Sequence, residues 1–294
     1  MQLTQPEGRP FRAAVIGHPI SHSRSPDLHR AAYSYLAALG EYEAVDVEPG
    51  ELDAFLHQFR TDLAWRGLSV TMPHKRAVVA YLDQIHEPAL TLGAVNTVRA
   101  VRTSDHPVRL EGYNTDVQGI VSALRFAGYK GAGDAVVLGG GGTAAAALSA
   151  LAMLHVRSAT LIIRNPDKAD SLMRVAQALG VNLSVSTFDG ALKVIAGATA
   201  TISALPPRAA DSVADHLLHA CTDLFGKVLL DVAYDPWPSC LASVWEAQRG
   251  VTVSGLDMLV YQAAEQALLF TEAPRALLPG VINAMCGAVG APRR

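Results

Sequence analysis

The sequence has 294 residues, of which 50% are hydrophobic and 17% are charged, and its formal net charge is −3. This length and composition predict a compact globular protein of about two domains. The near-neutral charge excludes the basic surface of a protein that binds nucleic acid or an anionic membrane.

The N-terminal stretch MQLTQPEGRPFR lacks the apolar core of a signal peptide, and three widely spaced cysteines form neither a disulfide framework nor a metal motif. We therefore expect a protein of the reducing cytoplasm. Two uncharged stretches, 135–154 and 276–292, are long enough to suggest membrane spans. Glycine or proline interrupts both, so we predict a strand, turn and helix for the first and a buried terminal helix for the second.

Apolar runs of strand length alternate with helical patterns, which is typical of an α/β fold with a largely parallel sheet. The N-terminal half has predicted strands at 13–17, 41–47, 67–71, 94–98 and 108–114, predicted helices at 26–39, at 51–60 and from 73, and a turn at 103–105. A second α/β series begins near 116 with a helix at 116–127 and predicted strands at 135–138, 159–163, 183–187, 199–204, 228–232 and 251–253. The change of character near residue 116 predicts a domain boundary there.

The loop after the first predicted strand reads GHPISHSRSP (17–26). Ser25 is a suitable N-cap and Pro26 suits the first helical position, so a structural role explains this pair. The open N-terminus of a helix also attracts anions, and side-chain hydroxyl groups can help to hold one. Both interpretations of Ser25 stay open at this point.

The segment AVVLGGGGTA (135–144) places four glycines between a predicted strand and a predicted helix. Gly139, Gly141 and Ala144 fit the G-x-G-x-x-A form of the dinucleotide-binding fingerprint. In that motif the first glycine permits a tight turn, and the second lets the backbone approach a pyrophosphate. The sequence therefore predicts a dinucleotide-binding site in the second domain.

The next strand predicts which dinucleotide is bound. NAD-binding proteins usually place an acidic residue at the end of this strand to accept the ribose 2′-hydroxyl. Here the strand ends at Arg164, with Asn165 next and Lys168 close behind. A guanidinium group suits a 2′-phosphate, so we predict NADP rather than NAD.

Three strand–helix junctions in the N-terminal half carry polar side chains. They are the loop 17–26, the segment SVTMPHK (69–75) and the segment YNTDVQG (113–119). The carboxyl ends of parallel strands share one edge of a sheet, so we expect these segments to meet there. Thr115 and Gln118 also fit a capping box, which leaves a structural role for Thr115 open.

Lys75 and Asp116 are the candidate catalytic pair among these residues. A nearby carboxylate favours the ammonium form of lysine and keeps it available as a proton donor. Reduction of a ketone needs such a donor, because the carbon receives a hydride and the oxygen receives a proton. His18, His22 and His29 share a region, but no carboxylate or cysteine set completes a metal site, so no metal is predicted.

Seven segments occur in the order of one known family and cover nearly the whole chain. They are GHPISHSRSP (17–26), SVTMPHK (69–75), GAVNT (93–97), NTD (114–116), GGGGTA (139–144), YDPWP (234–238) and GLDMLVYQA (255–263). Together they resemble the shikimate dehydrogenase family. The resemblance implies an NADP-dependent enzyme that reduces 3-dehydroshikimate to shikimate in the chorismate pathway of aromatic amino-acid biosynthesis.

The resemblance also implies domains and residue roles. It implies a substrate-binding domain at 1–115, a Rossmann NADP-binding domain at 116–254, and C-terminal helices at 255–294 that pack back on the substrate domain. The implied substrate ligands are Ser23 and Ser25 at the carboxylate with Tyr234 nearby, and Thr71, Asn96 and Gln262 at the ring hydroxyls, while Lys75 and Asp116 are the implied catalytic pair. The implied NADP contacts are Gly139, Gly140, Gly141, Gly142 and Thr143 at the pyrophosphate, Arg164, Asn165 and Lys168 at the adenosine phosphate, and Gly255 and Met258 at the nicotinamide.

The sequence departs from the family pattern at several positions. Ser69 stands where the family usually has Asn, so we expect one polar contact to be shorter or absent. His18 replaces the commoner Asn, and TISALPP (201–207) replaces a frequent NAT stretch on the adenosine side. None of these departures removes Lys75 or Asp116.

Other functions remain open at this stage. One is a quinate/shikimate dehydrogenase that uses NAD, against which the Ser23–Ser25 pair and Arg164 argue by resemblance. Another is a catalytically silent NADP-binding regulator on the same fold. A third is a tetrahydrofolate-linked dehydrogenase, in which the SRSP loop has no evident role. We expect a small-molecule substrate as the partner, no nucleic acid or membrane, and either a monomer or a homodimer.

Overall fold

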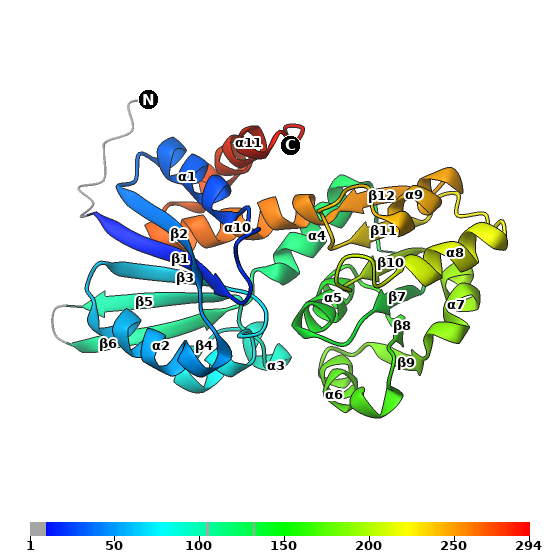
Figure 1. The fold of residues 1–294 in the computed structure, drawn as a ribbon, viewed down its shortest axis with the longest axis horizontal. Helices are drawn as coiled ribbons and strands as arrows, with labels where there is room; N and C mark the ends of the chain where they lie inside the picture. Colours follow the sequence, from blue (N-terminus) through cyan, green and yellow to red (C-terminus); the bar gives the residue numbers. More distant parts are fainter. Residues whose placement is uncertain (1–9, 104–105, 132) are drawn as a thin grey trace. The chain divides into compact units, whose positions relative to one another are not determined.

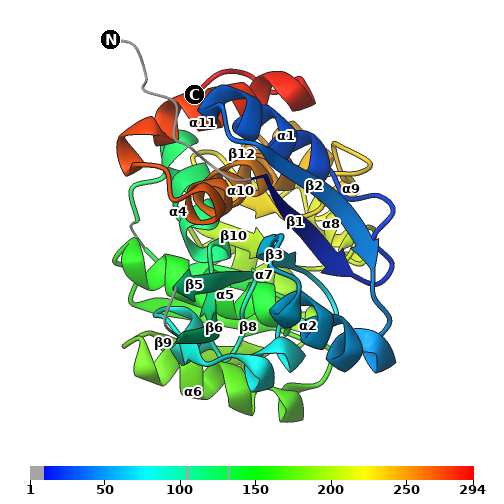
Figure 2. The same cartoon turned by 90° about the vertical axis from the view of Figure 1, so that its left-hand side faces the viewer.

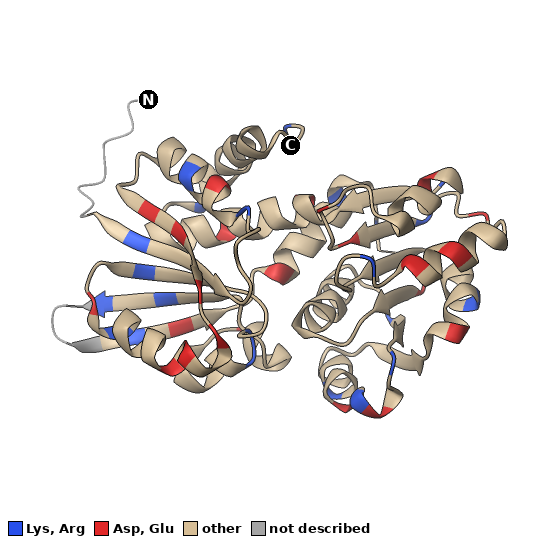
Figure 3. Ribbon diagram, in the orientation of Figure 1, with Lys and Arg blue, Asp and Glu red and all other residues tan. Residues whose placement is uncertain are grey.

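The structure is a computed structural model that describes residues 10–103, 106–131 and 133–294. It confirms the predicted α/β class, since helices pack on two separate six-stranded sheets (Figure 1). The chain divides into two compact units: unit 1 comprises Met1–Thr115 and Val260–Arg294, and unit 2 comprises Asp116–Leu259. Acidic and basic residues are interspersed over both units (Figure 3). No helix in the described residues combines the length and hydropathy needed to span a bilayer.

The sheet of unit 1 is mixed and has the order β2-β1-β3-β5-β6-β4. Its strands are β1 (Phe11–Gly17), β2 (Gly40–Asp46), β3 (Trp65–Val70), β4 (Gln84–Ile85), β5 (Thr97–Thr103) and β6 (His106–Tyr113). β1, β2 and β3 are parallel, whereas β5 and β6 form an antiparallel hairpin beside β3. β5 begins at Thr97, later than the strand expected at 94–98, and residues 104–105 of the turn expected at 103–105 lie outside the described residues.

Helices cover both faces of this sheet (Figures 1 and 2). One face carries α1 (Ser25–Leu36), the C-terminal part of α10 (Gly255–Thr271) and, beyond them, α11 (Leu278–Val289), preceded by a 3₁₀ turn at Arg275–Leu277. The other face carries α2 (Leu52–Thr61), preceded by a 3₁₀ turn at Pro49–Glu51, and α3 (Ala89–Leu92). Successive side chains of β1 point to opposite faces of the sheet. Ala14 and Ile16 point to the α2 face and belong to the hydrophobic core there. On the α10 side, a Cβ at Gly67 would lie 2.1 Å from the Phe270 ring, so glycine is what permits close packing there.

The sheet of unit 2 is entirely parallel and has the order β12-β11-β10-β7-β8-β9. Its strands are β7 (Ala135–Leu138), β8 (Ser158–Ile162), β9 (Asn182–Ser186), β10 (Ala200–Ser203), β11 (Val228–Asp231) and β12 (Val251–Ser254). This is the strand order of the doubly wound dinucleotide-binding fold. Strands β8 and β9 are added on one side of β7, and the chain then crosses over to place β10, β11 and β12 on the other side. Ligands of such sheets bind at the carboxyl ends of the strands beside that switch point.

Two layers of helices sandwich the parallel sheet (Figure 1). One layer contains α4 (Asp116–Phe126), α5 (Gly142–Met153) and α6 (Asp170–Ala178), and the other contains α7 (Ala191–Gly197), α8 (Asp211–His219) and α9 (Cys240–Ala247). Short 3₁₀ turns at Pro166–Lys168 and Phe188–Gly190 precede α6 and α7. α5 has no charged residue and is built mainly of alanine and leucine, so it packs closely on the sheet and on α4.

The prediction of a helix that begins at Pro73 is wrong. Residues 72–76 form turns, and a 3₁₀ helix follows at Ala77–Tyr81. The segment is held at several points, because the buried His74 ring contacts the Val47 carbonyl oxygen at 2.7 Å and Val95 N–H donates to the Lys75 carbonyl. These long-range contacts override the helical start signal that Pro73 suggested. The two-residue strand β4 also escaped sequence analysis, since it is too short to show a periodicity.

Candidate active site

The polar segments of unit 1 meet at one edge of its sheet. Ile16 pairs with Val70, so the loops that leave β1 and β3 start side by side. Thr97 pairs with both Ser69 and Tyr113, which brings the start of β5 and the end of β6 to the same edge. The three junctions of this half of the chain are therefore neighbours, as parallel-strand geometry predicts.

The first loop ends at α1, where the structure corrects one expectation. The N-cap of α1 is Arg24, and Ser25 is the first helical residue, without a side-chain capping bond. Ser25 N–H instead donates to Ser23 Oγ at 3.3 Å. His29 Nδ1 donates to the Ser25 carbonyl at 3.0 Å, and burial lowers the pKa of His29 to about 3, so this ring is a neutral structural group. The Ser25 hydroxyl is thus not used for capping.

The second segment carries Thr71 and Lys75 on a tight turn. Thr71 N–H donates to the Ile16 carbonyl at 2.9 Å, and the Thr71 carbonyl accepts from His74 N–H at 2.9 Å. Gly17 allows this turn to approach β1, because a Cβ there would lie 2.5 Å from the Thr71 methyl carbon. Thr71 and Lys75 are both half-buried, so each side chain is held by the sheet while it retains contact with solvent.

The third segment forms a buried cluster of amides and hydroxyls with Asn96 and α10. Asn96 Oδ1 accepts from Thr115 N–H at 2.8 Å, and Asn96 Nδ2 donates to Thr115 Oγ1 at 2.9 Å and to Gln262 Oε1 at 3.3 Å. The capping-box interpretation of Thr115 is wrong, because its N–H bonds Asn96 and Gln118 Nε2 donates to Ser122 instead. The structure therefore brings the predicted ligands Asn96 and Gln262 into direct contact.

Sequence analysis missed a continuation of this cluster. Tyr42 donates to Ser69 Oγ at 2.6 Å, and Ser69 donates to Gln266 Oε1 at 2.7 Å. Gln266 Nε2 in turn donates to the Asn96 carbonyl at 3.1 Å and to Thr97 Oγ1 at 2.9 Å. The one available signal was the i, i+4 spacing of Gln262 and Gln266, which places both on one face of α10.

The glycine-rich loop of unit 2 joins β7 to α5 at the switch point. Gly139 has φ +108°, and a Cβ there would lie 3.0 Å from the Ala204 carbonyl oxygen, so this position requires glycine. Its N–H donates to the Ile162 carbonyl at 2.9 Å, which ties the loop to the end of β8. Gly141 is the N-cap of α5 and has open space at its Cα, so backbone can approach a pyrophosphate here. Gly140 is exposed, and Gly142 and Thr143 open the helix.

The end of β8 presents basic side chains beside this loop. Arg164 is exposed, and its guanidinium makes no ion pair with any described residue. Asn165 is the N-cap of the following 3₁₀ turn and accepts from Asp167 N–H at 3.0 Å, while Lys168 closes that turn and is exposed. The donor set therefore fits an anionic group such as a ribose phosphate. Asn165 also has a structural role that the sequence did not reveal.

The remaining predicted residues lie in unit 2 as well. Tyr234 follows β11 on a loop that Asp231 anchors, since Asp231 accepts from Ser239 Oγ at 2.6 Å and from Ala233 N–H at 3.3 Å. Burial raises the pKa of Asp231. Tyr234 thus belongs to a different unit from the other predicted substrate ligands.

Asp116, Gly255 and Met258 complete the predicted set. Asp116 is buried and opens α4, directly after Thr115 in the chain. Gly255 opens α10 so close to β11 that a Cβ would lie 2.0 Å from the Val232 carbonyl oxygen. Met258 lies one turn further along α10 and is buried.

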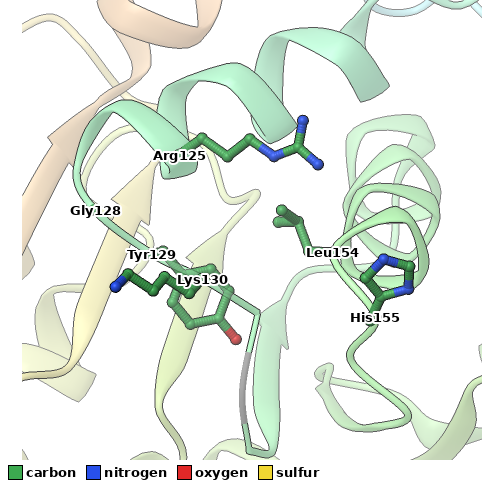
Figure 4. A pocket seen from close by; sticks show the side chains of 6 residues that line it. All are labelled: Arg125, Gly128, Tyr129, Lys130, Leu154 and His155. Carbon is green, nitrogen blue, oxygen red and sulfur yellow. The ribbon is translucent and has the colours of Figure 1, made fainter.

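A separate cavity of about 360 Å³ lies in unit 2 between the ends of α4 and α5 (Figure 4). Arg125, Tyr129, Lys130, Leu154 and His155 line it, far along α5 from the glycine-rich loop. The Lys130 side chain points away from Leu154 and His155, so the basic groups do not converge on one point. Across the described part of the chain, no three His, Cys, Asp or Glu side chains gather where they could hold a metal ion.

Comparison with known proteins adds an independent finding. Residues 15–98 match the family model described as the shikimate dehydrogenase substrate binding domain. The chain is 34% identical over 290 residues to a Moorella thermoacetica protein named shikimate dehydrogenase (NADP(+)), covering 94% of this chain and 93% of that one.

Solved structures give the same picture. The Mycobacterium tuberculosis shikimate dehydrogenase has a TM-score of 0.82 and 37% identity, with 96% of this chain and 99% of that chain covered. A Thermus thermophilus shikimate 5-dehydrogenase in complex with NADP(H) and shikimate has a TM-score of 0.77 and 30% identity, with 95% and 99% covered.

Proposed function

Because this chain belongs to the shikimate dehydrogenase family, we infer that it catalyses the NADP-dependent reduction of 3-dehydroshikimate to shikimate. The enzyme is an oxidoreductase of aromatic amino-acid biosynthesis. The observation that carries this function is the 34% identity to an NADP-dependent shikimate dehydrogenase over more than nine-tenths of both chains. The residue roles that follow are proposals.

Unit 1 provides the substrate-binding surface. Ser23 and Ser25 bind the carboxylate, because their hydroxyls lie at the N-terminus of α1, where the helix dipole favours an anion. Asn96 and Gln262 are assigned to the ring hydroxyls, since their amide side chains contact each other at the edge of the sheet where the polar segments meet. Thr71 adds a hydroxyl from the turn after β3. Tyr234, which belongs to unit 2, is assigned to the carboxylate on the family resemblance alone.

Unit 2 provides the NADP site, and its residues fit this cofactor. The loop Gly139–Gly140–Gly141–Gly142–Thr143 offers an open glycine cradle and the N-terminus of α5 for the pyrophosphate. Arg164 and Lys168 supply positive charge for the 2′-phosphate, and Asn165 can still donate with its Nδ2. Gly255 and Met258 line the nicotinamide site. NADPH, when bound, supplies the hydride that the ketone carbon receives.

Lys75 and Asp116 carry out the proton chemistry. As the ketone carbon receives the hydride, negative charge develops on the ketone oxygen, and the Lys75 Nζ ammonium stabilises that charge and donates a proton to the oxygen. Asp116 is assigned as the second member of the catalytic pair on the family resemblance. In the oxidation of shikimate the step runs in reverse, and the Lys75 amine accepts the proton that the hydroxyl group releases.

Steady-state oxidation of shikimate and of quinate, each with NADP and with NAD, tests this function on the purified protein. We expect efficient turnover with shikimate and NADP only. Preference for quinate or for NAD would overturn the assigned specificity. NADP binding without turnover of either acid would instead indicate a regulatory protein.

A further inference from the structure

Hydrogen bonds extend the proposed substrate site well beyond the residues assigned to it. A continuous chain leads from Asn96 through Thr97, Gln266 and Ser69 to the Tyr42 phenol. Its members are almost completely buried, with exposures of 0–4%. Such a chain has a defined direction only if something fixes which atom donates at each step.

Two backbone groups fix that direction at the Asn96 end. Thr115 N–H can only donate, so the side-chain atom that it contacts at 2.8 Å is the Asn96 oxygen Oδ1. Thr97 Oγ1, 2.7 Å from the same oxygen, must therefore donate to it. This leaves Asn96 Nδ2 to donate to Gln262 Oε1.

The second fixed group is the Asn96 carbonyl, which can only accept. The Gln266 atom 3.1 Å from it must be Nε2, and the same amide nitrogen donates to Thr97 Oγ1 at 2.9 Å. Gln266 Oε1 therefore faces Ser69 and accepts its proton at 2.7 Å. With its only proton committed, Ser69 can offer Tyr42 a lone pair but cannot donate to a ligand.

Tyr42 is consequently the donor at which the chain begins. Burial raises the pKa of Tyr42, so the phenol keeps its proton throughout the ordinary pH range. The Tyr42 ring is held in place by stacking on His29, with ring centroids 3.8 Å apart. One buried hydroxyl thus connects to the proposed ring-hydroxyl site.

We propose that Tyr42 is a positioning residue of the substrate site, whose phenol orients the amides of Asn96 and Gln262 through Ser69 and Gln266. This assignment rests on the proposed function of unit 1. Reversing any member of the chain would set buried donor against donor or acceptor against acceptor, which is costly without water. Tyr42 therefore supports shikimate binding without contacting the reacting atoms.

The variant Tyr42→Phe tests the assignment, and Tyr33→Phe is its matched control. Both tyrosines are buried in one aromatic cluster, but the Tyr33 hydroxyl has no hydrogen-bond partner among the described residues. We expect Tyr42→Phe to raise KM for shikimate by about threefold to tenfold, the usual worth of one such bond. kcat and KM for NADP should change by less than about twofold, and Tyr33→Phe should leave all three constants unchanged.

A merely structural effect would give a different result. Partial unfolding lowers the active fraction, and therefore kcat, while KM for shikimate stays the same. That outcome, or equal effects of the two Phe variants, would overturn the assignment. Absence of shikimate turnover by the unmodified protein would overturn the proposed function, and this assignment with it.

A double-mutant cycle tests the route through Ser69. If Tyr42 acts partly through Ser69, Tyr42→Phe should raise KM by a smaller factor in a Ser69→Ala background than in the unmodified protein. Equal factors in both backgrounds would show that Tyr42 does not act through Ser69.

Discussion

Replacing Arg164 with alanine should weaken NADP binding and leave NAD binding almost unchanged. Arg164 follows β8 beside the glycine-rich loop, is exposed, and makes no ion pair with any described residue. Its removal therefore leaves no buried partner unsatisfied, and the loss reports the contact with the 2′-phosphate alone. Hydrogen bonds to charged groups are worth about 1.5–3 kcal/mol, which corresponds to a Kd about 10- to 150-fold weaker.

The assay is titration of the protein with NADP and with NAD, following either cofactor fluorescence in the reduced forms or heat of binding. Arg174→Ala is the matched control, because Arg174 is exposed on α6 of the same unit and its loss removes the same charge. The loss of NADP affinity caused by Arg164→Ala should become smaller as salt is added, because the Arg164 side chain is exposed. Equal loss of NADP and NAD affinity would refute the 2′-phosphate assignment. An equal loss of NADP affinity in Arg174→Ala would also refute the assignment, because the loss would then reflect the charge of the protein as a whole and not a contact with the 2′-phosphate.

Three further predictions follow from the structure. Lys75→Ala should lower kcat by about 10²- to 10⁴-fold with a much smaller effect on shikimate binding, and a near-normal kcat would remove this lysine from the chemistry. Gly255→Ala should destabilise the protein by about 1–3 kcal/mol, measured by urea unfolding, because the new methyl group would lie 2.0 Å from a backbone carbonyl oxygen; an unchanged midpoint would contradict this. Burial raises the pKa of Asp83, but hydrogen bonds from Leu110 N–H and Arg60 outweigh it and lower the pKa below 3.8. The ionised Asp83 carboxylate therefore adds to the free energy of unfolding at neutral pH, and this stabilisation is lost as the pH falls through the lowered pKa. The variant Asp83→Asn should be less stable than the unmodified protein at pH 7 and equally stable in strong acid.

The dinucleotide-binding unit was the most predictable part of the fold. Its strands are short apolar runs with helices between them, and the glycines at 139–142 mark the crossing from β7 to α5. These are local signals, and parallel α/β units leave few ways to arrange them. The position of Arg164 at the end of β8 followed from the same pattern.

The substrate side of unit 1 was less predictable, because long-range contacts determine it. Tyr42 bonds a residue 27 positions away, and Ser69 bonds one 197 positions away. No periodicity or spacing in the sequence indicates either hydrogen bond. Ser69 was noticed only as a departure from the family pattern, and its partners explain how a serine is accommodated there.

Local signals also misled where tertiary contacts outweighed them. Ser25 and Pro26 have the composition of a helix start, yet Arg24 occupies the cap position. Pro73 likewise suggested a helix, but backbone contacts on both sides hold that segment as turns.

The most direct test of the function is reduction of 3-dehydroshikimate by the purified protein with NADPH. Loss of NADPH absorbance, with shikimate formed in equal amount, is the predicted result. If NADPH binds but is not consumed, and no shikimate forms, then the function assigned to this chain is contradicted.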